Sequence, residues 1–227
     1  MEIAGFIKNS FVDFPGVIAS VVFTPFCNFN CWYCHNCEVI SQVKGTIPEE
    51  EVFDFLEKRK GFVDGVVISG GEPTLQKDLV PFARKIKHMG FKVKLDTNGT
   101  NLSAVESLVN EKLVDYIAMD IKAPLDKYGQ IIQKEWPKEQ ILSAINYIKN
   151  CGVDHEFRTT FSPDLTKEDI VQIASLVGNG HKFSLQQYNK NSENAPSPHA
   201  EAYIKETGEA IKDKVLDLKI KGIKTIF

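Results

Sequence analysis

Four of the chain's five cysteines lie close together, in the segment FTPFCNFNCWYCHNC over residues 23–37. Cys27, Cys31, Cys34 and Cys37 are separated by three, two and two residues. Thiolates at such short spacings bind metal ions or iron–sulfur clusters, because one loop can direct several sulfurs to one centre. Where thiols are kept reduced, clustered cysteines more often hold metal than form disulfides. We therefore expect a metal centre in this segment.

The spacing narrows the kinds of centre that these cysteines could build. A paired zinc ribbon needs two well-separated CxxC pairs, and no second pair exists here. A closed four-thiolate cube would use Cys37, although Glu38 follows it where proline is frequent. The alternative is a cube held by Cys27, Cys31 and Cys34 that leaves its fourth iron open, as catalytic metals require. The simpler interpretations of the segment are a structural zinc site or buried thiols. For Cys37 we expect a free thiol near the cluster, and a redox role or a role as fourth ligand is the second interpretation.

A glycine-rich turn follows the second β-rich run, in SGGEPTLQ. Gly70 and Gly71 remove side chains where the backbone must pass close to something, and Glu72 places an acceptor beside them. Alone, such a turn is common.

Charged residues follow the next β-rich runs, in LDTNG and AMDIKAP. Asp96, Asp120 and Lys122 could hold hydroxyls, a carboxylate or a small cation, or they could form surface salt bridges. Arg158 in EFRTTF and the polar end QQYN are weaker candidates, since a charged residue in a strand is as often a structural ion pair. The Asn-Gly pair in LDTNG is normally a tight turn.

Short β-branched runs alternate with amphipathic stretches along nearly the whole chain, a pattern that predicts buried parallel strands and helices. Predicted strands cover 17–24, 65–70, 91–97, 114–122, 155–161 and 182–188. Predicted helices cover 48–61, 77–90, 103–112, 137–152, 166–178 and about 199–213, before a strand-like tail over 217–227. The helix from Thr166 has a capping-box start, with Asp169 three residues later.

Six strand-then-helix units predict an α/β fold with a parallel sheet. Six units would form either an incomplete (β/α)6 barrel, with helices outside, or a doubly wound sheet, and we expect the barrel. In both, chemistry gathers at the carboxyl ends of the strands. No repeat or linker divides the chain, so we expect one domain over 1–227, with a cluster loop over 24–38 and a rim loop over 189–199.

The totals fit a globular protein of 227 residues, with 43% hydrophobic and 25% charged residues. A net charge of -3 argues against non-specific nucleic-acid binding. No run approaches the length of a membrane span, and the N-terminus lacks the features of a signal peptide. We expect a cytoplasmic protein with no membrane partner.

The motifs together resemble the radical S-adenosylmethionine (SAM) enzymes, through CxxxCxxC with an aromatic residue, Tyr33, before the last cysteine and through the Gly-Gly-Glu-Pro turn one strand later. KNSFVDFPGVIASVVFTPFCNFNCWYCHN, LDTNG and MDIKAPLDKY further resemble the glycyl-radical-enzyme activases, most closely the anaerobic ribonucleoside-triphosphate reductase activating proteins. The matching segments spread from about residue 5 to 190. The resemblance implies an incomplete radical SAM barrel.

On matching positions, the resemblance implies one [4Fe-4S] cluster held by Cys27, Cys31 and Cys34, with the amino and carboxylate groups of SAM on the open iron. It implies that Tyr33 and His35 flank the cluster and face SAM. Further implied cofactor-binding residues are Gly70, Gly71 and Glu72 at the SAM ammonium, Asp120 and Lys122 near the ribose and carboxylate, and, more weakly, Arg158 and Asn189. Asp96, Thr97 and Asp120 could hold a monovalent cation.

The chain departs from some relatives in two places. Where pyruvate formate-lyase activases have a histidine after a tyrosine on the sixth strand, this chain reads Tyr188-Asn189, and asparagine can hydrogen-bond a ribose but cannot titrate. Many relatives also carry a ferredoxin-like insertion. With only Cys37 and Cys151 left over, this chain cannot hold a second cube unaided.

The implied activity is a radical SAM oxidoreductase reaction. One electron from a flavodoxin- or ferredoxin-type donor would cleave SAM to methionine and a 5′-deoxyadenosyl radical, which would take a hydrogen from a glycine Cα of a large partner enzyme. The alternatives are a formate-lyase-type partner, a radical SAM enzyme acting on a small molecule, and a non-enzymatic iron–sulfur or zinc protein.

Overall fold

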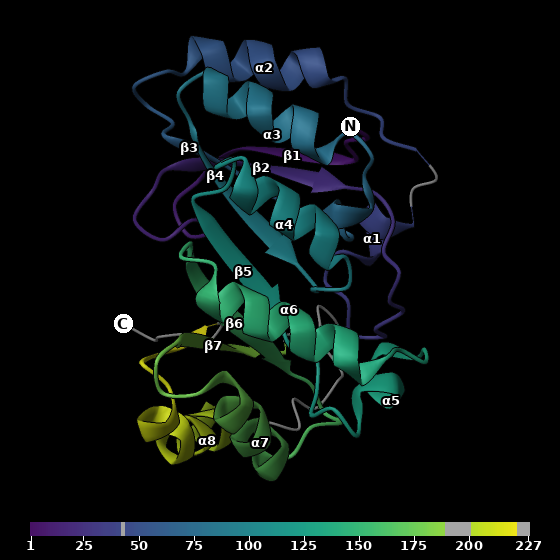
Figure 1. Ribbon diagram of the computed structural model, residues 1–227, viewed down its shortest axis with the longest axis vertical. Coiled ribbons are helices and arrows are strands. Elements are labelled where there is room, and N and C mark those ends of the chain that lie inside the picture. The colour runs from purple at the N-terminus through teal and green to yellow at the C-terminus, as the bar shows by residue number, and fades with distance from the viewer. Residues whose placement is uncertain (42–43, 189–200, 222–227) are drawn as a thin grey trace. The chain divides into compact units, whose positions relative to one another are not determined.

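The computed structural model describes residues 1–41, 44–188 and 201–221 (Figure 1). The strands are β1 (Gly5–Ser10), β2 (Ala19–Thr24), β3 (Gly65–Gly70), β4 (Lys92–Thr97), β5 (Tyr116–Asp120), β6 (Asp154–Phe161), β7 (Lys182–Gln187) and β8 (Asp217–Lys221). The helices are α1 (Cys37–Ile40), α2 (Glu49–Lys58), α3 (Leu79–His88), α4 (Leu102–Asn110), α5 (Tyr128–Ile132), α6 (Lys138–Asn150), α7 (Lys167–Val177) and α8 (Glu201–Ile211), and short 3-10 turns cover Pro73–Leu75 and Lys212–Lys214.

Contacts divide the chain into two compact units. Unit 1 comprises Met1–Asn28, His35–Ala118 and Gln140–Asp154, and unit 2 comprises Phe29–Cys34, Met119–Glu139 and the described residues from His155 onward. The boundary passes through the cysteine segment, so Cys27 belongs to unit 1 and the next two cysteines belong to unit 2.

The sheet of unit 1 begins with β1, which pairs antiparallel with β2. β2, β3 and β4 then pair in parallel and in chain order. The register places Val21 opposite Val67 and Val67 opposite Lys94. Because the strands are parallel and in register, Thr24, Gly70 and Thr97 fall at the same carboxyl edge of the sheet.

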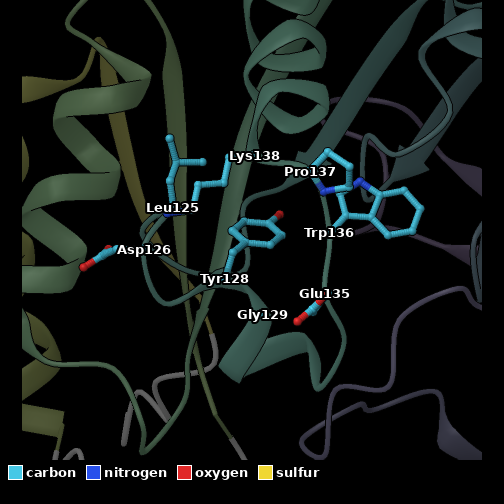
Figure 2. Close-up of a pocket in the computed structure, with 8 residues that line it drawn as sticks. All are labelled: Leu125, Asp126, Tyr128, Gly129, Glu135, Trp136, Pro137 and Lys138. Carbon is cyan, nitrogen blue, oxygen red and sulfur yellow. The ribbon is translucent and has the colours of Figure 1, made fainter.

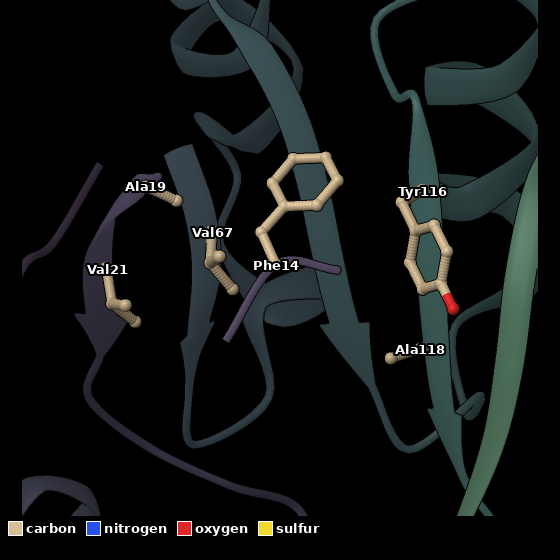
Figure 3. Close-up of a cluster of buried hydrophobic side chains, with 6 residues drawn as sticks. All are labelled: Phe14, Ala19, Val21, Val67, Tyr116 and Ala118. Carbon is tan, nitrogen blue, oxygen red and sulfur yellow. The ribbon is translucent and has the colours of Figure 1, made fainter. Parts of the chain in front are cut away.

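Apolar side chains cover both faces of this sheet. One cluster is made by Phe14, Ala19, Val21, Val67, Tyr116 and Ala118 (Figure 3). Side chains that alternate with these along the strands, such as Val22 and Ile68, are also fully buried. Burial on both faces is typical of parallel strands in α/β folds and explains why the runs read as almost continuously apolar.

In unit 2, β6, β7 and β8 pair in parallel and in chain order. Helix α7 begins with the predicted capping box. The Thr166 side chain accepts a hydrogen bond from the backbone nitrogen of Asp169, and the Asp169 side chain accepts one from the backbone nitrogen of Thr166. Phe161 of β6 stacks on Tyr203 of α8, with ring centroids 5.7 Å apart. In the same unit α8 also packs against α7 and against β8.

The predicted elements are confirmed with small shifts at their ends, and the six predicted strands are β2 to β7. The expectation of parallel strands alone needs one correction, because β1 is an additional antiparallel strand at the sheet edge. α1 and α5 were not predicted, β8 lies in the predicted strand-like tail, and the predicted rim loop over 189–199 lies outside the described residues. In the part of the chain that is described, no helix has both the length and the apolar character needed to cross a bilayer.

Candidate functional site

The cysteine segment leaves β2 against the end of β3, and two glycines make this contact possible. A Cβ on Gly70 would lie 2.3 Å from the Thr24 nitrogen, and one on Gly71 would lie 1.7 Å from the Phe26 carbonyl oxygen. The Gly71 nitrogen donates to the Thr24 oxygen at 2.9 Å, and the Glu72 nitrogen donates to the Phe26 oxygen at 2.7 Å. The close approach predicted at these glycines is therefore an approach to protein backbone.

Glu72 lies in the interior of unit 1 and links the ends of β3 and β4. Its side chain is 1% exposed and accepts four hydrogen bonds. Oε1 accepts from the nitrogen and hydroxyl of Thr74 and from the Thr97 hydroxyl, at 3.1, 2.5 and 2.7 Å, and Oε2 accepts from the Asn98 nitrogen at 2.6 Å. Burial raises the pKa of Glu72, and the hydrogen bonds oppose this rise. The carboxylate acts as an internal anchor for both strand ends.

Asn98 connects the end of β4 to the first cysteine. Its side-chain nitrogen donates to Asn28 Oδ1 at 2.8 Å and lies 3.9 Å from the sulfur of Cys27. Thr100 closes the group, since it donates to Asn98 Oδ1 at 2.6 Å and accepts from Asn28 Nδ2 at 2.8 Å. Sequence reasoning treated Asn98 only as part of a turn and missed Asn28 and Thr100. No motif in the sequence distinguishes these residues from ordinary loop residues.

Asp96, near the end of β4, is partly exposed and is held by neighbouring side chains. Lys94, which is 1% exposed, forms an ion pair with Asp96 Oδ1. The Ser69 hydroxyl donates to Asp96 Oδ2 at 3.1 Å. Sequence reasoning missed Lys94, because the alternation of Lys92 and Lys94 with apolar residues looks like an exposed strand face.

The second and third cysteines lie in unit 2, within a short segment packed on aromatic residues. Cys31 and Cys34 are half-buried, and the Cys34 nitrogen donates to the Cys31 oxygen at 3.1 Å. Burial raises the pKa of the Cys31 thiol, and the positive charge of Lys122 opposes this rise. Tyr33 is 5% exposed, and its buried hydroxyl makes no well-formed hydrogen bond in the described structure, although it lies close enough to the Cys31 thiol to help lower the pKa of that thiol.

Asp120, Lys122 and Arg158 form one ionic group in unit 2. Arg158 Nε donates to Asp120 Oδ1 at 2.8 Å, and Lys122 Nζ donates to Asp120 Oδ2 at 3.0 Å. Burial alone would raise the pKa of Asp120, but attraction to Arg158 and Lys122 outweighs burial and holds this pKa well below its usual range. The structural ion pairs that the sequence analysis gave as an alternative for these residues are thus present, and they keep Asp120 ionised at neutral pH.

A pocket of about 490 Å³ is lined by residues of the segment 125–138, which runs from the loop after β5 to the first residue of α6. Figure 2 shows the ring of Tyr128 near its middle, with Leu125 and Trp136 on either side in that view. The Tyr128 hydroxyl accepts from the Lys122 nitrogen at 3.3 Å. The indole nitrogen of Trp136 is buried and has no hydrogen-bond partner among the residues described. None of the predicted site residues lines this pocket.

The cysteines offer the donor atoms of a metal centre, because thiolate sulfurs bind both zinc and the irons of iron–sulfur clusters. None of the five cysteines forms a disulfide. Within the described ranges, no three His, Cys, Asp or Glu side chains are placed to share one ion. The Tyr33 hydroxyl, which makes no well-formed hydrogen bond, is a buried polar group that a bound molecule would satisfy.

The remaining predicted site residues are not part of the hydrogen-bonded and ionic groups described above. His35 and Cys37 are both exposed, and Cys37 begins α1. The side chain of the intervening Asn36 donates to the Gly70 oxygen at 2.9 Å. Asn189 lies outside the described residues. The structure therefore groups Gly70, Glu72 and Cys27 in one unit and Cys31, Tyr33, Asp120, Lys122 and Arg158 in the other.

Comparison with known proteins gives consistent matches. The sequence pattern of one protein family, the Radical SAM superfamily, matches residues 21–177 of this chain. A Methanocaldococcus jannaschii protein named as a glycyl-radical enzyme activating enzyme is 37% identical over 99% of this chain and 98% of its own length. The pyruvate formate-lyase-activating enzyme of Clostridium pasteurianum is 32% identical over 74% of this chain and 72% of its own length.

Solved structures agree on the fold. SuiB of Streptococcus suis bound to S-adenosylmethionine has a TM-score of 0.70 at 15% identity, and the match covers 88% of this chain and 49% of that chain. QueE from Escherichia coli has a TM-score of 0.57 at 15% identity, over 98% of this chain and 94% of that chain. Identities this low show the fold alone, which is the partial TIM-barrel type with parallel strands.

Proposed function

This chain belongs to the radical SAM superfamily and, within it, to the glycyl-radical enzyme activases, and from that premise we propose that it generates a glycyl radical on the anaerobic ribonucleoside-triphosphate reductase. The enzyme class and its use of a [4Fe-4S] cluster and SAM follow from the family. The named partner rests on the sequence resemblance of LDTNG, MDIKAPLDKY and the cysteine segment.

We propose that Cys27, Cys31 and Cys34 hold the cluster. When bound, the reduced cluster supplies the electron that cleaves SAM. The hydrogen-bonded group of Asn28, Asn98 and Thr100 then holds the first cysteine near the end of β4. Cys37 is left as an exposed thiol at the start of α1, which supports its expected place outside the ligand set.

For the SAM ammonium, we propose that the backbone around Gly70 and Gly71 makes the contact and that Glu72 positions it. The Glu72 carboxylate is buried and already accepts four hydrogen bonds, so its role is to fix the segment that carries the backbone oxygens. Asn36, which donates to the Gly70 oxygen, restrains the same segment from the cysteine side.

For the other end of SAM, the proposed residues are Lys122 and Arg158 with Asp120 between them. Two cations share one carboxylate, so a net positive charge remains to attract the carboxylate of SAM. Tyr33 would contribute its buried hydroxyl, and His35 stays a proposed neighbour of the cofactor. Asn189 keeps its proposed ribose contact.

A formate-lyase-type partner is the second candidate, because several pyruvate formate-lyase-activating enzymes are among the relatives. A small-molecule radical SAM activity has weaker support, from relatives named as GTP 3′,8-cyclases that match a smaller share of their own length.

We further propose a flavodoxin- or ferredoxin-type electron donor, no nucleic-acid partner and a cytoplasmic location, on the clustered thiols and the net charge of -3.

The 37% identity over 99% of the chain with an activating enzyme carries the activase class, and the sequence resemblance of the motifs supports the reductase as its partner. The test is anaerobic reconstitution with iron and sulfide, followed by SAM cleavage and by electron paramagnetic resonance of a glycyl radical on each candidate partner. We expect a radical on the reductase and none on a formate lyase. A radical on the formate lyase alone would reverse that assignment.

Cysteine variants separate the enzyme from a non-enzymatic metal protein. We expect Cys31→Ala to lose SAM cleavage, because a cube that lacks one thiolate is no longer held, and Cys151→Ala to retain it as the matched control. Zinc in place of iron in anaerobically purified protein, or SAM cleavage that persists in Cys31→Ala without a cluster, would contradict the proposal.

A further inference from the structure

The sequence resemblance suggests three groups for a monovalent cation: the carboxylates of Asp96 and Asp120 and the oxygen of Thr97. A site for sodium or potassium needs oxygen atoms that lack a stronger partner, because the cation must replace its water shell with them. In this structure each of the three groups already has protein partners of its own.

Asp96 carries the main evidence. Its Oδ1 is in an ion pair with Lys94, and its Oδ2 accepts from the Ser69 hydroxyl at 3.1 Å. Lys94 is 1% exposed and lies on β4 opposite Val67, with the buried residues Val93 and Leu95 on either side in sequence. A lysine this deeply enclosed stays charged only with a counter-charge in contact, and Asp96 supplies it.

The other two groups are similarly engaged. The Thr97 hydroxyl donates to Glu72 at 2.7 Å and accepts from the Gly99 nitrogen at 3.0 Å, which uses its proton and one of its two lone pairs. In the other unit, the Asp120 carboxylate contacts Lys122 at 3.0 Å and Arg158 at 2.8 Å. A further positive ion beside Asp96 would meet the Lys94 ammonium at close range and be repelled by it.

We propose that the Lys94 ammonium permanently supplies the positive charge that a bound monovalent cation would bring to Asp96, so that this enzyme folds and binds SAM without sodium or potassium. A covalently attached charge is always present, whereas a dissolved ion must bind at the expense of its hydration. The SAM part of this inference rests on the proposed function, and the folding part does not.

The test compares salts on the reconstituted enzyme at equal ionic strength. Thermal unfolding midpoints are measured without SAM in sodium, potassium and choline chloride, because choline is too large to enter a carboxylate site. We expect the wild type to have the same midpoint and the same SAM dissociation constant in all three salts. A saturable rise in either stability or SAM affinity with sodium or potassium would overturn the proposal.

Lys94→Met tests the replacement directly. The variant leaves Asp96 without its counter-charge, so we expect a lower midpoint in choline chloride that sodium or potassium partly restores, and SAM affinity about tenfold weaker in choline than in sodium. Adding Asp96→Asn to Lys94→Met should abolish this cation response. A folded Lys94→Met variant that is indifferent to the cation would count against the proposal.

Lys87→Met is the matched control, since Lys87 forms an ion pair with Asp115 at 2.7 Å in a half-exposed position of the same unit. We expect the unfolding midpoint of Lys87→Met to be the same in sodium, potassium and choline chloride. A cation response as large as that of Lys94→Met would indicate a general salt effect and refute the proposed role of Lys94. If Lys94→Met does not fold, the wild-type comparison still decides. Failure to bind SAM in any salt would refute the proposed function while the midpoints test the Lys94 role.

Discussion

The side-chain nitrogen of Asn98 lies 3.9 Å from the sulfur of Cys27. Asn98 is itself 5% exposed, and its oxygen and nitrogen are held by Thr100 and Asn28. The donor therefore has a fixed direction toward the first cysteine. In iron–sulfur proteins, hydrogen bonds to the ligating sulfurs stabilise the extra electron of the reduced cluster and raise its potential.

We therefore predict that Asn98→Ala lowers the midpoint potential of the cluster. For a single weak hydrogen bond, the expected change is on the order of 20 mV. Anaerobic redox titration followed by electron paramagnetic resonance measures it. Asn101→Ala is the control, because Asn101 caps α4 and should affect stability without moving the potential. An unchanged potential in Asn98→Ala would mean that the amide does not reach the sulfur.

Gly71→Ala should strongly destabilise the protein. The added Cβ would lie 1.7 Å from the Phe26 carbonyl oxygen, a backbone atom that cannot move without breaking its hydrogen bond with the Glu72 nitrogen. We expect a loss of about 3 kcal/mol or more in the free energy of unfolding, measured by urea denaturation. Gly180→Ala, where a Cβ meets nothing within 4 Å, should be nearly neutral. Equal stability of the two variants would show that the β2 and β3 ends are less tightly joined.

Tyr33→Phe should keep or raise stability in the protein without SAM. It removes a buried hydroxyl that makes no well-formed hydrogen bond and has only the weak acceptor Cys31 nearby, and burying such a hydroxyl without SAM costs about 1 kcal/mol or more. SAM affinity should fall, because the hydroxyl is then missing from the bound state. Tyr128→Phe is the control and should destabilise, since its hydroxyl accepts from Lys122. Calorimetry and equilibrium dialysis would measure both quantities. Loss of stability in Tyr33→Phe would reveal a partner for that hydroxyl.

The ionic group of Asp120 should make stability depend on acid. The pKa of this carboxyl is lowered in the folded state, so its stabilisation is fully present above the unfolded pKa of about 3.9 and is lost as the pH falls below it. We expect Asp120→Asn to be less stable than the wild type by about 3 kcal/mol at pH 7, because Arg158 and Lys122 lose their counter-charge. Unfolding curves from pH 7 to 3 should show this difference shrinking. Glu57→Gln, in an exposed pair with Lys60, should show little difference at any pH.

Much of the fold was predictable because its parallel strands are buried on both faces. Runs such as VVIS and VVFT contain few residues that suit any other structure, so β2 and β3 were predicted to within two residues. β1 was missed because an edge strand has one open side, and its Lys8, Asn9 and Ser10 carry no such signal. α5 was missed because it is short and because the residue after it, Gln133, has a left-handed conformation that its residue type does not predict.

The candidate site was predictable where chemistry is tied to a motif and not where it depends on packing. The cysteines, the glycine turn and the strand-end charges were selected by residue type and spacing. Lys94 was not, because only the three-dimensional structure shows that a lysine between Val93 and Leu95 faces the interior. The enclosure of Glu72 was likewise hidden, since two of its four hydrogen bonds come from Thr97 and Asn98, 25 and 26 residues further along the chain.

The backbone contact between Phe26 and Gly71 has a consequence for how the enzyme matures. Phe26 has a φ of 65°, a conformation that is costly for a side chain of its size, and two hydrogen bonds from the turn after β3 hold the backbone of Thr24 and Phe26 in place. The entropic cost of ordering Phe26, the residue before the first proposed iron ligand, is therefore met when the chain folds. Iron and sulfide delivered afterwards would meet a first anchor that is already set, and only the later thiols would have to adjust as the cluster is inserted.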